Sequence, residues 1–230
     1  MQDEDNYIIK VNLFRLDLPL IKPYKLSYNT FHSFEPLLIH VIDKNGKEGW
    51  GEQHISPGSS SETREGGWTF ARVLSKLVLK KSVEEAKKII SSYTHFSKVA
   101  SSAMITAIEM MENNSILANR SSIKLKLLTA FSAEEEFEIK DELDRVIEEG
   151  FSTIKIKVGK DVNSDLKKLN LIQTHLNGRA SLRIDANRGY TKADGCNFVK
   201  QLEPDYIELF EQPCDAGDWE ANASVAKLSK

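Results

Sequence analysis

The chain has 230 residues, of which 40% are hydrophobic and 28% charged, and its net charge is -3. This length supports one large or two modest domains, and the balanced charge provides no field that attracts nucleic acid or an anionic membrane. Two cysteines are too few for a disulfide framework. The acidic first residues lack an apolar leader and no apolar stretch could span a bilayer, so we expect a cytoplasmic protein without membrane or nucleic-acid partners.

The first half of the chain predicts strands and then helices. Segment 7–16 alternates roughly, with Ile9, Val11 and Leu13 as its apolar positions, and a polar, aromatic loop is expected over 22–30. A turn at Asn45-Gly46 predicts a hairpin. The expected strands of that hairpin are 36–43 and 48–52, and the expected helices are 67–79, 83–92 and 98–111. Ser82 and Glu85 fit a capping box, and small residues in the last helix favour close packing.

From residue 123 the pattern changes to alternating strand and helix, which predicts a parallel sheet closing toward a barrel. The expected strands are 124–131, 153–158, 181–186 and 205–210. The expected helices are 132–149, 163–176, 191–202 and one that begins at 218. Ser132 and Glu135 are expected to cap the first of these helices. The strands amount to about half of those in a closed barrel.

Polar side chains recur at one pitch along these strands. Lys155 and Lys157 lie in one strand, Asp185 ends the next, and Glu211 ends the one after. The separations from Lys157 to Asp185 and from Asp185 to Glu211 are 28 and 26 residues, about the length of one β/α unit. Because barrel strands end side by side on one face, these groups are expected to converge on one site.

The chemistry of this set favours proton transfer at carbon. Alternation sends Ile154 and Ile156 to one face and the lysines to the other, and two adjacent ammonium groups would depress each other's pKa and prepare one lysine as a base. Carboxylates suit Mg²⁺ or Mn²⁺. Each residue alone has a plainer explanation, such as a solvent-facing edge strand, a helix-capping aspartate or a surface glutamate. Their shared position is what argues for a site.

The chain resembles the enolase superfamily, in its muconate-lactonizing enzyme and mandelate racemase branch that includes dipeptide epimerases of the L-Ala-D/L-Glu type. Segment 150–161 is similar to the part of that branch that holds a catalytic lysine pair. Segments 182–190 and 207–213 are similar to its metal-ligand segments, and Gly49-Trp50-Gly51-Glu52 is similar to a signature of its N-terminal capping domain. The resemblance covers nearly the whole chain.

The resemblance implies an α+β capping domain, residues 1–120, followed by an incomplete α/β (TIM-type) barrel of about the first four β/α units, residues 121–230. It implies that Lys157 is a base and that Lys155 lowers its pKa and touches the substrate carboxylate. Asp185 and Glu211 would be two of three Mg²⁺ ligands. The residues expected to contact substrate are Tyr24 and Ser27 in a lid-like loop, Asn187, and Thr129, which is placed by its spacing of 28 residues before Lys157.

The implied activity is that of a Mg²⁺-dependent racemase or epimerase of a dipeptide or N-acyl amino acid, which would be a homo-oligomer when full length. An o-succinylbenzoate synthase and a muconate cycloisomerase share the metal site and the lysines, so both stay open. The resemblance places a third metal carboxylate and an opposing lysine on later strands, past residue 230. An inactive, truncated or pseudoenzyme half-barrel is therefore the other alternative.

Overall fold

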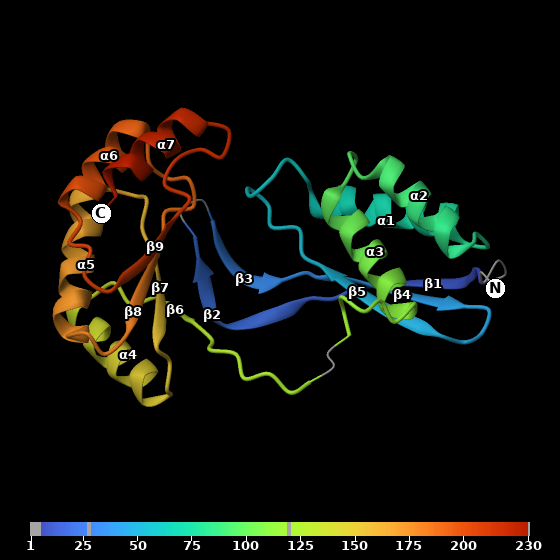
Figure 1. Cartoon of the computed structure of the whole chain (residues 1–230), viewed down its shortest axis with the longest axis horizontal. Coiled ribbons are helices and arrows are strands. Elements are labelled where there is room, and N and C mark those ends of the chain that lie inside the picture. The colour runs from blue at the N-terminus through green and yellow to red at the C-terminus, as the bar shows by residue number, and fades with distance from the viewer. Residues whose placement is uncertain (1–5, 27–28, 119–120, 230) are drawn as a thin grey trace. The chain divides into compact units, whose positions relative to one another are not determined.

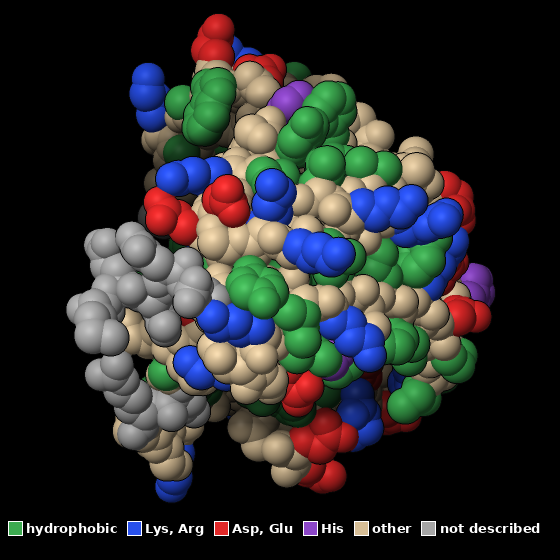
Figure 2. Space-filling view, turned by 90° about the vertical axis from the view of Figure 1, so that its right-hand side faces the viewer, with side chains coloured by type: hydrophobic (Ala, Val, Ile, Leu, Met, Phe, Trp, Pro, Cys, Tyr) green, Lys and Arg blue, Asp and Glu red, His purple; other side chains and the backbone are tan. Residues whose placement is uncertain are grey.

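A computed structural model describes residues 6–26, 29–118 and 121–229 (Figure 1). The chain divides into two compact units, one of Met1–Tyr24 and Thr30–Ser122, the other of Lys25–Asn29 and Ile123–Lys230. Within the described ranges, no helix is long and apolar enough to cross a membrane. Figure 2 shows Lys and Arg side chains interleaved with acidic and hydrophobic ones on the face that it displays. The two signs of charge are thus interspersed on this face, as they are along the sequence.

The first unit contains an antiparallel sheet of order β1-β4-β5. Its strands are β1 (Ile8–Arg15), β4 (Leu37–Asp43) and β5 (Glu48–Gln53). The pairing of β1 with β4 shifts register between Ile8 and Lys10, and a bulge of this kind turns one extra residue outward. Ile8 is therefore fully buried while Ile9 is 49% exposed, so the bulge interrupts the predicted alternation at Ile9.

Two further strands, β2 (Leu18–Lys25) and β3 (Thr30–Phe34), form a separate sheet of order β2-β3. The sequence predicted an irregular loop over 22–30, and most of that range is strand. Pro19 and Pro23 weaken the strand signal along β2, but an edge strand tolerates proline because its outward N–H groups need no partner in the sheet. At the described end of the turn, the backbone N–H of Leu26 donates to the carbonyl of Asn29 at 2.8 Å.

Helices cover one face of the β1-β4-β5 sheet (Figure 1). They are α1 (Arg64–Val78), α2 (Val83–Tyr93) and α3 (Lys98–Met111). The capping box of Ser82 and Glu85 is confirmed. Helix α1 begins earlier than predicted because the Thr63 side chain accepts a hydrogen bond from the N–H of Gly66 and caps it. The close packing expected of α3 is confirmed, since a Cβ on Gly51 would lie 1.9 Å from the carbonyl oxygen of Ala103.

The second unit contains a parallel sheet of order β6-β7-β8-β9 with helices on one face (Figure 1). Its strands are β6 (Thr129–Phe131), β7 (Thr153–Lys157), β8 (Ser181–Asp185) and β9 (Ile207–Glu211). Its helices are α4 (Glu136–Glu148), α5 (Val162–Leu176), α6 (Lys192–Gln201) and α7 (Trp219–Leu228). The predicted strand–helix alternation is confirmed.

The segment before α4 departs from the prediction. The strand expected over 124–131 is reduced to β6, and Leu125 and Leu127 are exposed. Helix α4 has no side-chain cap at its first residue, so the predicted cap by Ser132 is wrong. The carboxylate of Glu142 instead accepts hydrogen bonds from the backbone N–H groups of Ser132 and Ala133, and Ser132 lies in the irregular segment between β6 and α4.

The sheet of the second unit separates apolar from charged side chains as predicted. Ile154 and Ile156 of β7 are fully buried in the core beneath the helices. Lys155 and Lys157 alternate with them and are 22% and 21% exposed. A strand turns successive side chains to opposite faces, so one face of the sheet stabilises the unit and the other holds the charged groups.

Candidate active site

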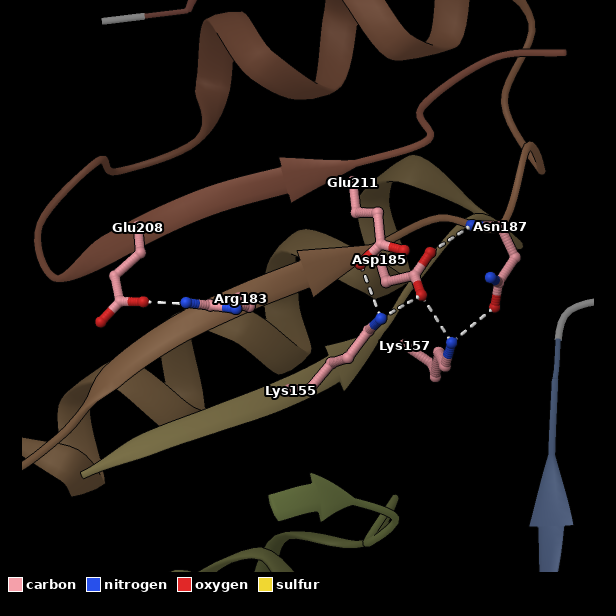
Figure 3. Close-up of polar contacts among 7 residues, drawn as sticks. All are labelled: Lys155, Lys157, Arg183, Asp185, Asn187, Glu208 and Glu211. Atoms are coloured by element: carbon pink, nitrogen blue, oxygen red, sulfur yellow. Dashed lines mark hydrogen bonds and ion pairs between the residues drawn. The ribbon is translucent and has the colours of Figure 1, made fainter. Parts of the chain in front are cut away.

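Lys157, Asp185 and Glu211 are the last residues of three adjacent parallel strands. Lys157 pairs with Asp185 in the register of β7 and β8, and Asp185 pairs with Glu211 in the register of β8 and β9. Residues in register on parallel strands share a face, so the three side chains leave the same edge of the sheet together (Figure 3). The pitch seen in the sequence thus corresponds to direct neighbours in space.

Asp185 connects both lysines. Its Oδ2 lies 2.8 Å from Nζ of Lys155 and 2.6 Å from Nζ of Lys157, and its side chain is 1% exposed. Nζ of Lys155 also donates to Oε2 of Glu211 at 2.6 Å, and Nζ of Lys157 donates to Oδ1 of Asn187 at 2.8 Å (Figure 3). Charge-assisted hydrogen bonds of this kind are about twice as strong as neutral ones, so the cluster has one defined arrangement.

Hydrogen bonds across the cluster favour the charged forms of Asp185 and Lys155. Burial alone would raise the pKa of Asp185, but hydrogen bonds from Lys155 and Lys157 and from the backbone N–H of Asn187 bring it below its ordinary value. Burial alone would lower the pKa of Lys155, but hydrogen bonds to Asp185 and Glu211 raise it above its ordinary value. The expectation of a depressed lysine pKa is therefore wrong for Lys155, because the carboxylates outweigh the neighbouring ammonium.

Asn187 lies beside the cluster, where its predicted role would need it. Its backbone has φ of +45°, a conformation that asparagine adopts more readily than most residues. In this conformation its N–H donates to Oδ1 of Asp185 at 2.9 Å, and its side chain faces Lys157. Contact with substrate stays a prediction for this residue.

The register of the sheet places Thr129 away from this cluster. Thr129 is in register with Ile154, whose side chain faces the helices, whereas Ala130 is in register with Lys155. Thr129 is thus misplaced for the predicted role, because one step along a strand changes the face. Tyr24 belongs to β2 and packs edge-on against Phe34, with 6.0 Å between ring centroids. Ser27 lies outside the described residues.

Sequence reasoning missed a second polar pair on the lysine face. Arg183 Nε donates to Oε2 of Glu208 at 3.0 Å (Figure 3). Thr153 Oγ1 lies 3.4 Å from the other carboxylate oxygen. Arg183 stands two positions before Asp185, so alternation alone places it on the same face. Glu208 reaches it because the pairing of β8 with β9 shifts register at Arg183, a feature without a signal in the sequence.

The carboxylates fit part of a Mg²⁺ site. Asp185 and Glu211 both reach the same Lys155 ammonium, so their oxygens converge on one point, and oxygen is the donor that Mg²⁺ prefers. In the part of the chain that the structure describes, no group of three or more His, Cys, Asp or Glu residues is placed to hold a metal ion. Asp185 and Glu211 are thus two convergent carboxylates, and metal binding by them stays a prediction.

Comparison with known proteins supports the resemblance seen in the motifs. Residues 138–230 match the family described as enolase C-terminal domain-like. The L-Ala-D/L-Glu epimerase of Bacillus subtilis (strain 168) is 26% identical over 229 residues, which cover 92% of this chain and 61% of that protein. Muconate cycloisomerase 1 of Acinetobacter baylyi is 25% identical over 231 residues, which cover 94% of this chain and 62% of that protein.

A solved structure shows the same fold. The dipeptide epimerase from Cytophaga hutchinsonii, complexed with Mg and the dipeptide D-Ala-L-Val, has a TM-score of 0.89 with this chain at 19% identity. The match covers 97% of this chain and 64% of that one. Residues 138–230 thus resemble the enolase C-terminal-like domain, and the relatives of the chain include epimerases, a racemase and a muconate cycloisomerase. The chain spans about three fifths of the length of the curated relatives that it matches.

Proposed function

We propose that this chain carries the proton-abstracting side of a Mg²⁺-dependent isomerase site, which acts on the hydrogen α to a carboxylate. The full enzyme would be a racemase or epimerase of a dipeptide or N-acyl amino acid. The observation that carries the proposal is that Asp185 binds both lysines while Glu211 binds one of them, all at one sheet edge. Relatives named as epimerases of dipeptides and a racemase of N-succinyl-Arg/Lys support this class of reaction.

In the proposed mechanism, Lys157 accepts the α-proton at Nζ. Oδ1 of Asn187 and Oδ2 of Asp185 orient that nitrogen from 2.8 and 2.6 Å, and Lys155 donates to the substrate carboxylate. Asp185 and Glu211 would hold Mg²⁺, which would stabilise the negative charge that develops on the substrate carboxylate. Proton removal by a positioned lysine follows from this arrangement.

The architecture is part of the same proposal. Residues 1–120 would be the capping domain, and residues 121–230 would be the first half of a (β/α)-barrel with about four β/α units. The parallel order β6-β7-β8-β9 with helices on one face supports this assignment. Homo-oligomerisation of the full-length protein is a further expectation from the family.

Two alternatives to the proposed function are each favoured by a specific observation. Relatives include the muconate cycloisomerase and an o-succinylbenzoate synthase from Listeria innocua that is 24% identical over 237 residues. An inactive half-barrel is the other alternative, because the described residues supply only part of a metal site. These alternatives differ in substrate and in turnover, so one assay separates them.

The test is exchange of the substrate α-proton with D₂O, followed by proton NMR in the presence of Mg²⁺. The panel contains dipeptides, N-acyl amino acids and an o-succinylbenzoate precursor. We expect exchange with a dipeptide or N-acyl amino acid, and we expect Lys157→Ala to abolish it. Lys200→Ala, at an exposed position of α6, is the matched control and should exchange as the wild type does. Exchange that survives Lys157→Ala would contradict the base assignment.

A further inference from the structure

The loop that follows Lys157 is fastened by a single buried carboxylate. Oδ2 of Asp165, in the first turn of α5, accepts hydrogen bonds from the backbone N–H groups of Gly159, Lys160 and Asp161 at 2.9, 3.1 and 3.2 Å. The Asp165 residue is 7% exposed. Three consecutive N–H groups that point at one carboxylate oxygen hold a loop in one conformation, because each buried donor would otherwise lose its partner.

The same oxygen also receives a bond from the next loop of the sheet. Tyr190, which follows β8, donates its hydroxyl to Oδ2 of Asp165 at 2.7 Å. Its ring is 5% exposed and packs against Phe198 and Phe210. Burial, followed by the hydrogen bond to Asp165, raises the pKa of Tyr190, so the hydroxyl keeps its proton and remains a donor. Asp165 and Tyr190 therefore join the loop after Lys157 to the loop after Asp185.

The two loops also touch backbone to backbone. A Cβ on Gly159 would lie 2.5 Å from the carbonyl oxygen of Ala186, and a Cβ on Gly189 would lie 2.2 Å from the carbonyl oxygen of Gly159. The N–H of Val158 donates to the carbonyl of Asp185 at 3.0 Å. The spacing between the two loops is thus fixed by direct contact, with the tyrosine–aspartate bond as its side-chain fastening.

The loops that follow Asp185 and Glu211 are joined differently. Backbone N–H groups of Ala186, Arg188 and Tyr190 donate to the carbonyls of Glu211, Gln212 and Pro213, at 3.1, 2.8 and 3.1 Å. Loss of the Tyr190 hydroxyl would leave these backbone bonds intact. The proposed base lies on β7 and the proposed metal ligands lie on β8 and β9. Loss of the hydroxyl would therefore loosen the loop after Lys157 and leave the two metal ligands joined as before.

We propose that Asp165 and Tyr190 are positioning residues that hold Lys157 in register with Asp185, and that they control proton transfer without controlling metal binding. This inference rests on the proposed function and extends it to two residues that touch neither the substrate nor the proposed metal site. Their effect is exerted through the loop of Gly159, Lys160 and Asp161.

The test compares Tyr190→Phe and Asp165→Asn with the wild type and with Tyr206→Phe. Tyr206 is an exposed tyrosine ahead of β9 and is the matched control for loss of a hydroxyl. Because small misplacement of a reacting group costs up to about 100-fold in rate, we expect Asp165→Asn to slow α-proton exchange by roughly 100-fold and Tyr190→Phe by roughly tenfold. Mg²⁺ affinity, measured by calorimetry, should be unchanged in both, and Tyr206→Phe should change neither quantity.

A parallel loss of Mg²⁺ affinity and exchange rate in Tyr190→Phe would overturn the proposal, as would an unchanged exchange rate. Amide hydrogen exchange on the same proteins distinguishes failure of the positioning proposal from failure of the proposed function. If the wild type exchanges no substrate proton, the proposed function fails, and the amide exchange rates of the variants then test the positioning role alone. Faster exchange confined to Gly159, Lys160 and Asp161 supports the positioning role, whereas unchanged or chain-wide faster exchange overturns it.

Discussion

The two faces of the β6-β7-β8-β9 sheet are made by alternate residues of the same strands, yet one buries apolar side chains and the other buries charged ones. On the helix face, Ile154 and Ile156 are fully buried, and burial of apolar surface stabilises by about 25 cal/mol per Å². On the other face, Asp185 is buried as an ion, and its desolvation is offset by Lys155, Lys157 and the backbone N–H of Asn187. Neighbouring residues therefore contribute either to stability or to the proposed chemistry, and single substitutions should affect one of these without the other.

The largest expected effect comes from Asp185→Asn on the charged face. Asparagine keeps the shape but not the charge, so it cannot hold Mg²⁺ as a carboxylate does. We expect loss of Mg²⁺ binding by calorimetry and a fall in α-proton exchange of at least roughly 1,000-fold. Glu203→Gln, in the loop before β9, is a control for the loss of one carboxylate. Retention of Mg²⁺ affinity in Asp185→Asn would contradict the metal assignment.

Ile156→Ala, on the apolar face, should instead lower the free energy of unfolding. Removing a fully buried isoleucine side chain costs about 2–5 kcal/mol, because a cavity remains. Urea unfolding measures this loss, and Ile9→Ala, at the exposed bulge of β1, should change the free energy of unfolding by less than about 0.5 kcal/mol. The folded fraction of Ile156→Ala should keep its Mg²⁺ affinity. A loss no greater than that of Ile9→Ala would contradict the assigned core.

The pH dependence of stability should report the charged face. The pKa of Asp185 is lowered in the folded state, so its contribution is present above the ordinary pKa near ~3.9 and is lost as the pH falls through the folded value. The pKa of Lys155 is raised, so its contribution is lost as the pH rises above ~10.4 and through the folded value. The difference in unfolding free energy between wild type and Asp185→Asn should therefore narrow at pH 3 relative to pH 7. A difference that stays constant would show that the ion pairs contribute nothing.

Glu208→Gln should have the smallest effect. Its partner Arg183 and the carboxylate are 42% and 37% exposed, and ion pairs with this much solvent contribute about 0–1 kcal/mol. Urea unfolding should show a loss within this range, and calorimetry should show unchanged Mg²⁺ affinity. A change in metal affinity would mean that the charged face acts as one network rather than as two separate pairs.

Local rules predicted much of this unit from sequence. Alternation along β7 predicted which side chains face the helices, and the pitch of β/α units predicted that Lys157, Asp185 and Glu211 end adjacent strands. Relations between strands were harder to predict. Thr129 lies on the opposite face from the one predicted, because the register of β6 against β7 has no local signal in the sequence. The pKa of Lys155 is raised rather than lowered as predicted, because it depends on the distances to two carboxylates.

Some features follow from neither alternation nor pitch. Strands β2 and β3 were missed because Pro19 and Pro23 weaken the strand signal while the pairing partner lies farther along the chain. Asp165 has the sequence signature of an acidic residue in the first turn of a helix, where it favours the helix dipole. Its contact with Tyr190 joins positions 25 residues apart, so only the folded unit reveals it.

The most direct measurement is the rate of deuterium incorporation at the substrate α-carbon as a function of Mg²⁺ concentration. The proposed site, Lys155 and Lys157 beside Asp185 and Glu211, predicts no exchange without metal and a rate that saturates at the Mg²⁺ affinity found by calorimetry. It also predicts that Lys157→Ala binds Mg²⁺ but exchanges no proton. Exchange that is independent of Mg²⁺, or Mg²⁺ binding by the wild type with no exchange of any substrate in the panel, would contradict it.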